Sequence, residues 1–315
     1  MTLGTLYLKL KKHWRAWLKM FYLKTFEGYY LTIPQNINEE IIISFTTIPS
    51  RISSTEFMLR SILAGRHLPK VFLMNVDIKT SRLLKDNRFL NALVERGLLE
   101  VNIVEDLKSY KKLVYSMKKY PNHNIVICDD DVLYPKNWFK SFSDYQVGNR
   151  DLKKIVCHRG HNVKLNQNGQ LESYKTWDFD VTTPSRITTM LFPTGTGGVY
   201  YPKNSLPPVA FNSHLFTKFA PHADDIWFWL SAISNNCHFG LLNNKVNYRD
   251  MYEIPDSQTF NLWSTNVNES KNDTQLRKSL KYFFESNLIN ESNTYYSLLY
   301  PTYNKIKDDS FYHIS

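Results

Sequence analysis

The segment Asn124-Ile125-Val126-Ile127-Cys128-Asp129-Asp130-Asp131 decides the fold expected for this chain. Its first five residues are mostly apolar, as in a fully buried strand, and three acids follow them without interruption. Strands of this kind occur mainly in parallel sheets that carry helices on both faces. The acids would therefore stand at the carboxyl end of a central strand, which is the edge where open parallel sheets bind ligands.

Apolar runs and amphipathic stretches alternate on the N-terminal side of this segment. The alternation predicts an α/β fold with a mostly parallel, Rossmann-like sheet flanked by helices. Strands are expected at 41–45, 71–76, 101–104 and 125–128. A first helix is expected to begin at a capping box formed by Ser53 and Glu56, and further helices are expected at 83–95 and 110–119.

The acid triplet has the composition of a metal site. Adjacent carboxylates that lose hydration near a core repel one another, and a divalent cation removes that cost. Mg²⁺ and Mn²⁺ take one or two carboxylates and complete their coordination with substrate phosphates. Because side chains alternate along a strand, Asp129 and Asp131 would share one face and Asp130 the other. The sequence thus predicts Asp129 and Asp131 as metal ligands, with an exposed acidic turn as the alternative.

A second acidic pair, Asp224-Asp225, opens an apolar stretch that ends at Leu230. Acids in the first turn of a helix also serve as caps and favour the helix dipole, so one of the two is explained without chemistry. The other remains a candidate general base.

A glycine-rich segment lies between the acidic motifs. Residues 193–202 read Pro-Thr-Gly-Thr-Gly-Gly-Val-Tyr-Tyr-Pro. Without a Gly-Lys-Ser/Thr it is not a P-loop, but its backbone amides can approach a sugar or a phosphate closely. A plain hairpin turn is the alternative interpretation.

The N-terminus is basic and amphipathic. Residues 1–30 hold six Lys or Arg against one acid, within a chain whose formal net charge is +10. Apolar and aromatic residues recur every three or four positions from Leu3 to Phe21, as on one face of a helix. Aromatic rings with lysines suit an anionic membrane surface, and a helix packed on its own domain is the alternative.

Composition excludes several classes of protein. Hydrophobic residues make up 43% of the 315 residues, which excludes disorder and collagen. The sequence contains no run of 18 apolar residues, so it predicts no membrane-spanning helix. Three widely spaced cysteines argue against a disulfide framework and a zinc knuckle, so we expect a cytoplasmic protein. Because of its basic amphipathic N-terminus, we expect this protein to be peripheral on the inner face of the cell membrane. No nucleic-acid-binding pattern is present.

The domain organisation follows from these segments. We expect a basic segment at 1–32, a catalytic domain at 38–254, and a C-terminal helical or irregular appendage at 255–315, where the composition turns rich in Asn, Ser and Tyr.

Taken together, the motifs resemble a known family. The strand with its acid triplet, Gly197-Gly198-Val199-Tyr200-Tyr201-Pro202 and Ala223-Asp224-Asp225-Ile226-Trp227, in this order, look like bacterial GT-A-fold glycosyltransferases that build lipopolysaccharide or capsule glycans. Tyr110-Lys111-Lys112-Leu113 adds to the resemblance, although the family often has Gly-Pro where this chain has Lys108-Ser109.

The resemblance implies sugar transfer from a nucleotide-diphosphate donor, such as a UDP-sugar, to a glycan or glycolipid hydroxyl. Asp129 and Asp131 would hold Mn²⁺ or Mg²⁺ on the diphosphate, and Asp225, or else Asp224, would take the acceptor proton in an inverting displacement. The implied donor-binding residues are Thr46, Arg51, Asp77, Lys112, Asp130, Gly197 and Gly198.

Two other functions fit parts of the pattern. A sugar nucleotidyltransferase would use similar carboxylates and a metal, but Ser44 to Arg51 lacks the glycines expected of its N-terminal loop. A non-catalytic glycan-binding or assembly protein would not need an intact acid triplet.

Overall fold

The computed structural model describes residues 3–26, 28, 36–149, 153–181, 190–242, 246, 250–255, 257 and 271–311. The chain divides into two compact units. Unit 1 holds residues 1–151, 196–200 and 242–260, and unit 2 holds residues 152–195, 201–241 and 261–315.

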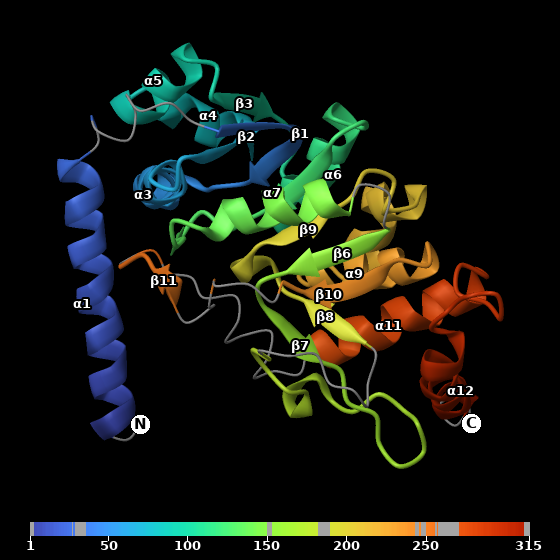
Figure 1. Ribbon diagram of the computed structural model, residues 1–315. Coiled ribbons are helices and arrows are strands. Elements are labelled where there is room, and N and C mark those ends of the chain that lie inside the picture. Colours follow the sequence, from blue (N-terminus) through green and yellow to red (C-terminus); the bar gives the residue numbers. More distant parts are fainter. Residues whose placement is uncertain are drawn as a thin grey trace. The chain divides into compact units, whose positions relative to one another are not determined.

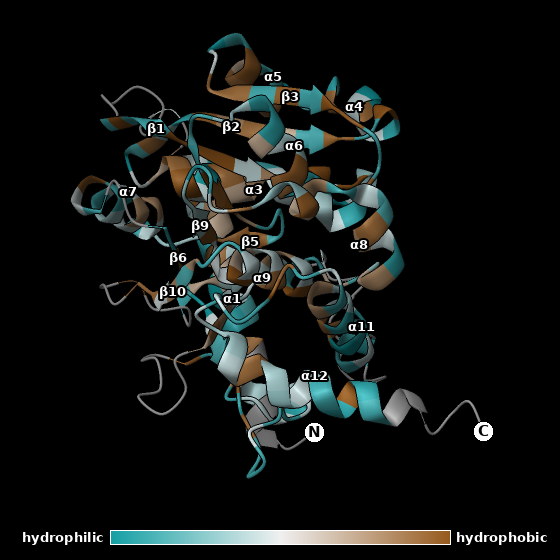
Figure 2. Cartoon of the chain, turned by 90° about the vertical axis from the view of Figure 1, so that its right-hand side faces the viewer, coloured by the Kyte–Doolittle hydropathy of each residue, from teal (hydrophilic) through white to brown (hydrophobic). Residues whose placement is uncertain are grey.

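Unit 1 is built on parallel strands (Figure 1). Strand β1 (Asn36–Phe45) pairs in parallel with β2 (His67–Val76) on one side and with β4 (Asn124–Ile127) on the other, so that Ile43 lies beside both Phe72 and Val126. Strand β3 (Leu99–Ile103) continues the sheet beyond β2, and β9 (Val199–Tyr201) lies next to β4. The predicted mostly parallel α/β sheet is confirmed, and Figure 2 shows hydrophobic residues along β1 and β2.

Helices connect these strands. They are α3 (Ile52–Leu63), α4 (Ile78–Leu84), α5 (Arg88–Glu95) and α6 (Lys111–Lys119), and α7 (Trp138–Gly148) follows the acid triplet. The chain runs outward from β1 to β3 and then returns to β4. Right-handed crossovers therefore put α6 on the opposite face of the sheet from α3.

Two predictions for these helices are wrong. The helix expected at 83–95 is two helices, because Asp77 and Asn87 each cap a separate start by accepting a hydrogen bond from a backbone amide. The capping box does not form. The N-cap of α3 is Arg51, without a side-chain cap, and Glu56 instead pairs with Arg60 at 2.7 Å.

The N-terminal helix α1 (Leu3–Thr25) packs on unit 1 through a narrow stripe. Ala16, Met20 and Leu23 are buried, and Lys19 beside them donates a 2.8 Å hydrogen bond to the carbonyl of Tyr134. Burial lowers the pKa of Lys19 to about 8. The predicted boundary at residue 32 lies outside the described residues. None of the helices in the described ranges combines the length and hydropathy that crossing a membrane requires.

The shorter elements of unit 1 flank the acid triplet. Strand β5 (Val132–Leu133) pairs antiparallel with β11 (Tyr252–Glu253), and the 3₁₀ helices η1 (Pro49–Arg51) and η2 (Lys108–Tyr110) precede α3 and α6.

Unit 2 contains two strand pairs and four helices among its described residues. Strand β6 (Lys154–Cys157) pairs in parallel with β10 (His238–Leu241), and β7 (Gly160–Asn162) pairs antiparallel with β8 (Leu191–Pro193). Its other elements are η3 (Tyr174–Thr176), η5 (Pro208–Phe211), α8 (Ser213–Phe219), α9 (Asp224–Ser234), α11 (Lys271–Glu285) and α12 (Tyr296–Phe311).

One helix of the segment predicted as an appendage lies within unit 2. Helix α11 packs there on α9. Leu276, Leu280 and Phe283 form its buried stripe, and the ring of Phe283 lies 5.2 Å from that of Trp227. Helix α11 is mostly polar in composition, but its apolar residues recur at helical spacing and therefore lie on one face.

Candidate active site

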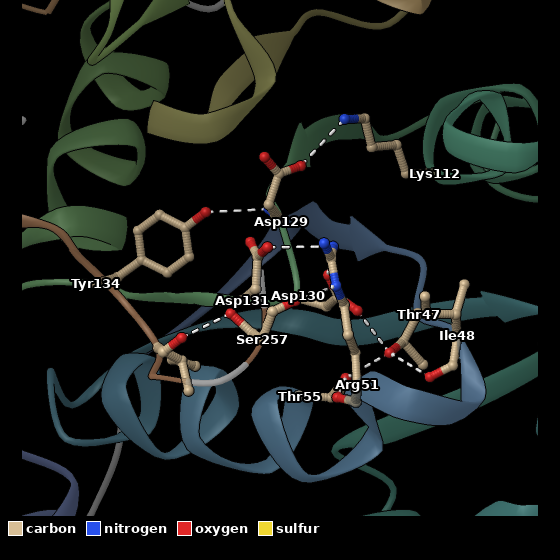
Figure 3. Close-up of polar contacts among 11 residues, drawn as sticks. Thr47, Ile48, Arg51, Thr55, Lys112, Asp129, Asp130, Asp131, Tyr134 and Ser257 are labelled. Carbon is tan, nitrogen blue, oxygen red and sulfur yellow. Dashed lines mark hydrogen bonds and ion pairs between the residues drawn. The ribbon is translucent and has the colours of Figure 1, made fainter. Parts of the chain in front are cut away.

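The acid triplet lies at the switch point of the unit 1 sheet. Strand β4 ends at Ile127, beside β1, and the chain turns at Asp130 and Asp131 before it enters β5. The strand order reverses here, because the chain runs outward from β1 through β2 to β3 and returns to β4 on the other side of β1. Such a reversal opens a crevice at the carboxyl ends of the two strands. The three acids therefore stand where the sequence placed them (Figure 3).

Asp130 is held by residues that follow β1. Its Oδ2 accepts a 2.6 Å hydrogen bond from the hydroxyl of Thr47, which in turn accepts one from the hydroxyl of Thr55 on α3. Its Oδ1 lies 3.3 Å from Nη1 of Arg51. A carboxylate that is only 5% exposed is thus bound by one neutral and one cationic donor.

The same guanidinium nitrogen also contacts Asp131. Nη1 of Arg51 lies 3.1 Å from Oδ2 of Asp131, and its Nε donates to the carbonyl of Ser257 at 3.0 Å. The carbonyl of Asp131 accepts from the amide of Ile254 at 2.8 Å. One arginine therefore serves two carboxylates and ties the acid turn to the segment around residue 255 (Figure 3).

Asp129 faces a different cation. Its carboxylate lies 3.2 Å from Nζ of Lys112 on α6, and its backbone amide donates to the hydroxyl of Tyr134 at 3.0 Å. That hydroxyl donates to the carbonyl of Thr196, so Tyr134 links the acid turn to the glycine-rich loop.

The charges of the cluster are not fully compensated. Burial, followed by repulsion from Asp130 and Asp129, raises the pKa of Asp131 to about 7. Burial likewise raises the pKa of Asp130 to about 6, although Arg51 and Thr47 oppose the rise. Burial acts on Asp129 as well, but Lys112 and a hydrogen bond from Thr196 hold its pKa below its ordinary value. The site thus carries more negative charge than Arg51 and Lys112 neutralise.

A divalent cation fits this donor set only with help from a ligand. Among the described residues, no group of three or more His, Cys, Asp and Glu side chains is placed to hold a metal ion. Two carboxylates completed by phosphate oxygens remain a normal Mg²⁺ arrangement. The alternation argument for Asp129 and Asp131 is wrong, because β4 ends before the acids and Arg51 contacts both Asp130 and Asp131.

Two other predicted donor-binding residues have structural partners. Thr46 donates to the carbonyl of Asn75 at 2.7 Å and so joins β1 to β2. Asp77 accepts from the amide and hydroxyl of Thr80 as the N-cap of α4, and it lies 3.7 Å from Nζ of the buried Lys111. Although Asp77 is partly desolvated, these donors lower its pKa.

The departure at Lys108 has a backbone consequence. Its φ is +55°, in the left-handed region that favours glycine. Residue 108 is thus a lysine in a backbone conformation that a glycine would adopt at lower cost, and it lies just before Lys111 and Lys112.

The glycine-rich loop is shaped by Trp138. Nε1 of Trp138 donates to the carbonyl of Gly197 at 2.8 Å. Gly198 has a φ of +90°, and a Cβ there would lie 2.5 Å from Cζ2 of Trp138. Packing and backbone conformation thus account for Gly198 without a ligand.

The second acidic pair lies in unit 2, at the start of α9. Oδ2 of Asp225 accepts from the amide of Gly195 at 3.2 Å, and Asp224 lies in the same first helical turn. Asp225 also lies close enough to the buried Tyr174 to add to the rise in its pKa, which burial dominates and Arg159 opposes. Asp225 is therefore fixed by a glycine of the loop that precedes β9.

Sequence reasoning missed Thr47, Thr55 and Tyr134. Thr46 and Thr47 are neighbours with the same side chain, and only the end of β1 decides which of them meets Asp130. Tyr134 follows the acid triplet by three residues, but its role depends on contacts with Asp129 and Thr196 that no spacing rule supplies.

Comparisons with known proteins give distant fold matches. No family model and no curated protein matches the chain. TarS 1–349 of S. aureus in complex with UDP is 16% identical, with a TM-score of 0.42 over 78% of this chain and 72% of that chain. The mannosyltransferase PcManGT from Pyrobaculum calidifontis, in complex with GDP-Man and Mn²⁺, is 11% identical, with a TM-score of 0.44 over 92% and 77%. An inositol-1-phosphate CTP transferase from T. maritima is 12% identical, with a TM-score of 0.37 over 65% and 85%.

Proposed function

We propose that the protein is a metal-dependent glycosyltransferase that moves a sugar from a nucleotide-diphosphate donor, such as a UDP-sugar, to a hydroxyl of a glycan or glycolipid in surface polysaccharide biosynthesis. The observation that carries the proposal is the acid cluster at the switch point, where the pKa values of Asp130 and Asp131 are about 6 and 7. Buried carboxylates with uncompensated charge are costly unless a cation joins them.

The metal ligands would be Asp129 and Asp131, with Mn²⁺ or Mg²⁺ between them and the donor. When bound, the ion neutralises charge that develops on the departing nucleoside diphosphate. Lys112, whose Nζ lies 3.2 Å from Asp129, would contact a phosphate oxygen. Arg51 orients Asp131, and Asp130, fixed by Thr47, would meet the ribose or the donor sugar.

Asp225 would act as the general base, with Asp224 as the second choice. The acceptor oxygen would form a bond to the anomeric carbon while the bond from that carbon to the diphosphate oxygen breaks. The acceptor proton would pass to the carboxylate of Asp225, whose Oδ2 is oriented by the amide of Gly195. A single displacement inverts the anomeric configuration, and NMR analysis of the product measures this directly.

We also propose that α1 docks on the anionic inner face of the cell membrane. Opposite its buried stripe, α1 presents large apolar side chains to solvent, and Trp14 and Phe21 are 65% and 73% exposed. A solvated helix gains nothing from such a face, whereas an interface buries it among headgroups. The other exposed members are Tyr7, Leu10, Trp17 and Leu18, with Lys11, Lys12, Arg15 and Lys24 around them.

Cosedimentation with phosphatidylglycerol vesicles tests the membrane proposal. Substituting both Trp14→Ser and Phe21→Ser should lower partitioning at least 10-fold, because each buried aromatic contributes roughly 1.5–3 kcal/mol. Tyr300→Ser, an exposed aromatic of unit 2, is the control. Equal binding to neutral phosphatidylcholine, or no loss on substitution, would contradict docking. Point variants are preferable to deletion of α1, which would also expose the surface beneath Met20 and Leu23.

Donor hydrolysis tests the catalytic proposal. Purified protein is incubated with Mn²⁺ or Mg²⁺ and a panel of UDP-, GDP- and CMP-sugars, and free nucleotide is scored with and without EDTA. Slow, EDTA-sensitive release of nucleoside diphosphate from one donor is expected. Pyrophosphate formation from a sugar phosphate and a nucleoside triphosphate would identify a nucleotidyltransferase instead. No release, with no thermal shift by any nucleotide plus metal, would favour a non-catalytic glycan-binding protein.

A further inference from the structure

Unit 2 contains a cavity of about 320 Å³ that none of the proposed catalytic residues lines. It lies between the loop at residues 166–173 and the helices α11 and α12, and its volume is that of a small-ligand site. Leu276 and Leu280 of α11 contribute apolar surface to its lining.

The walls of this cavity are joined by hydrogen bonds. The amide of Leu171 donates to the hydroxyl of Thr302 on α12 at 2.7 Å. On the opposite wall, Asp273 of α11 accepts from the amide of Tyr174 at 2.7 Å and from the hydroxyl of Ser173 at 2.8 Å. The loop is thus fixed to both helices, and the cavity is a built feature of unit 2.

The charged groups of the lining are used unequally. Both oxygens of Asp273 bind the loop, and Oε2 of Glu172 accepts from the hydroxyl of Thr176 at 2.8 Å. Arg277 and Lys305, from the two helices, form no ion pair with any residue in the described part of unit 2. Two acids are therefore occupied within the protein, while two cations at the cavity remain available to an anion.

One further polar group of the lining is available to a sugar hydroxyl. Nδ2 of Asn166 donates to Oε1 of Gln170 at 3.1 Å, and Oδ1 of Asn166 accepts from the amide of Gln170 at 3.0 Å, so both groups are used within the loop. Nε2 of Gln170 has no partner among the described residues and can donate to a hydroxyl.

We propose that this cavity binds a glycan segment that carries an anionic group, with Arg277 and Lys305 on the anion and Nε2 of Gln170 on a sugar hydroxyl. The lining of this cavity shares no residue with the acid cluster. Its occupation needs neither donor nor metal, so its test is independent of the proposed catalytic function.

The test is a binding titration of the full chain by isothermal calorimetry, without nucleotide or metal. The probes are the tetrasaccharide of galacturonic acid, neutral maltotetraose and inorganic phosphate. The acidic tetrasaccharide should bind at least 10-fold more tightly than either of the other two, and its affinity should fall with added salt. Equal affinity for maltotetraose would overturn the role of the anion, and equal affinity for phosphate would overturn the role of the sugar.

The matched variants locate the site. The double substitution Arg277→Ala and Lys305→Ala should weaken binding of the acidic tetrasaccharide at least 10-fold. Lys278→Ala with Lys307→Ala removes the same charge from exposed positions of the same helices and should change it less than twofold. Equal losses in the two double variants would show non-specific charge attraction and overturn the proposal. The salt dependence of the unmodified protein tests the anion contact even if the first variant fails to fold.

Discussion

Two acidic motifs of the chain look alike in sequence and differ in the structure. Asp129-Asp130-Asp131 in unit 1 lies in a turn after a buried strand, where Asp130 and Asp131 are 5% and 6% exposed. Asp224-Asp225 in unit 2 opens α9, where both side chains are half-buried and Asp225 accepts from the backbone of Gly195.

The difference shows how context gives carboxylates different tasks. At a helix start, backbone amides and the helix dipole stabilise the charged form locally. In the turn, three carboxylates share Arg51 and Lys112, and burial raises the pKa of two of them. The excess negative charge in the buried turn suits the binding of a cation, whereas a single oriented carboxylate suits the acceptance of a proton.

The largest effect that would separate the motifs is expected from Asp131→Asn. Transfer should fall at least 1,000-fold, because a metal ligand is lost, while thermal stability should stay equal or rise, since a costly buried charge is removed. Turnover and melting temperature are measured on the same preparation. Asp144→Asn on α7, whose carboxylate is exposed and paired with Lys140, is the control and should retain activity. Retained transfer by Asp131→Asn would break the comparison.

The next largest effect is expected within the second motif. Asp225→Asn should lower turnover roughly 10²–10⁴-fold, the usual contribution of a general base, and should flatten the acidic limb of the pH–rate profile. Asp224→Asn is the matched neighbour and should lower it less than about 10-fold. If Asp224→Asn proved the more damaging, the base assignment would pass to Asp224.

The pH dependence of stability compares the two acidic motifs without an activity assay. A carboxyl whose folded pKa lies above its unfolded value binds more protons when folded, so metal-free stability should fall as pH rises from about 4 to about 7. Asp131 contributes to this loss, because burial and the neighbouring carboxylates raise its pKa to about 7.

Denaturant unfolding in EDTA measures this pH dependence. Asp131→Asn should make the slope shallower and leave the part due to Asp130, whose pKa is also raised, and Asp225→Asn should leave the slope unchanged. A pH-independent difference between the unmodified protein and Asp131→Asn would contradict the raised pKa.

The smallest effect concerns the segment that presents Lys112 to Asp129. Lys108→Gly should stabilise the protein by about 0.5–1 kcal/mol, because the left-handed φ of residue 108 costs a lysine more than a glycine. Lys118→Gly, inside α6, should destabilise it by about 1 kcal/mol. Chemical denaturation compares the two, and a loss of stability in Lys108→Gly would indicate that the lysine side chain makes a necessary contact.

The sequence predicted the parts that local patterns control. Apolar runs located β1, β2, β3 and β4 to within a few residues at their carboxyl ends, because buried parallel strands need uninterrupted apolar side chains. The capping box at Ser53 and the continuous helix at 83–95 were wrong, since Glu56 found Arg60 and Asn87 capped a new helix. The boundary at 255 stays a prediction, and the composition on which it rests did not reveal the stripe by which α11 packs on α9.

By itself, the sequence determined that three acids follow a central strand of a parallel sheet and that α1 is amphipathic, because both follow from periodicity and order along the chain. Only the tertiary structure decided that Arg51 serves two of those acids, that Thr47 and not Thr46 meets Asp130, and that Lys19 joins α1 to Tyr134. These contacts connect residues that are far apart in sequence, and their geometry depends on where each strand ends and how each helix packs.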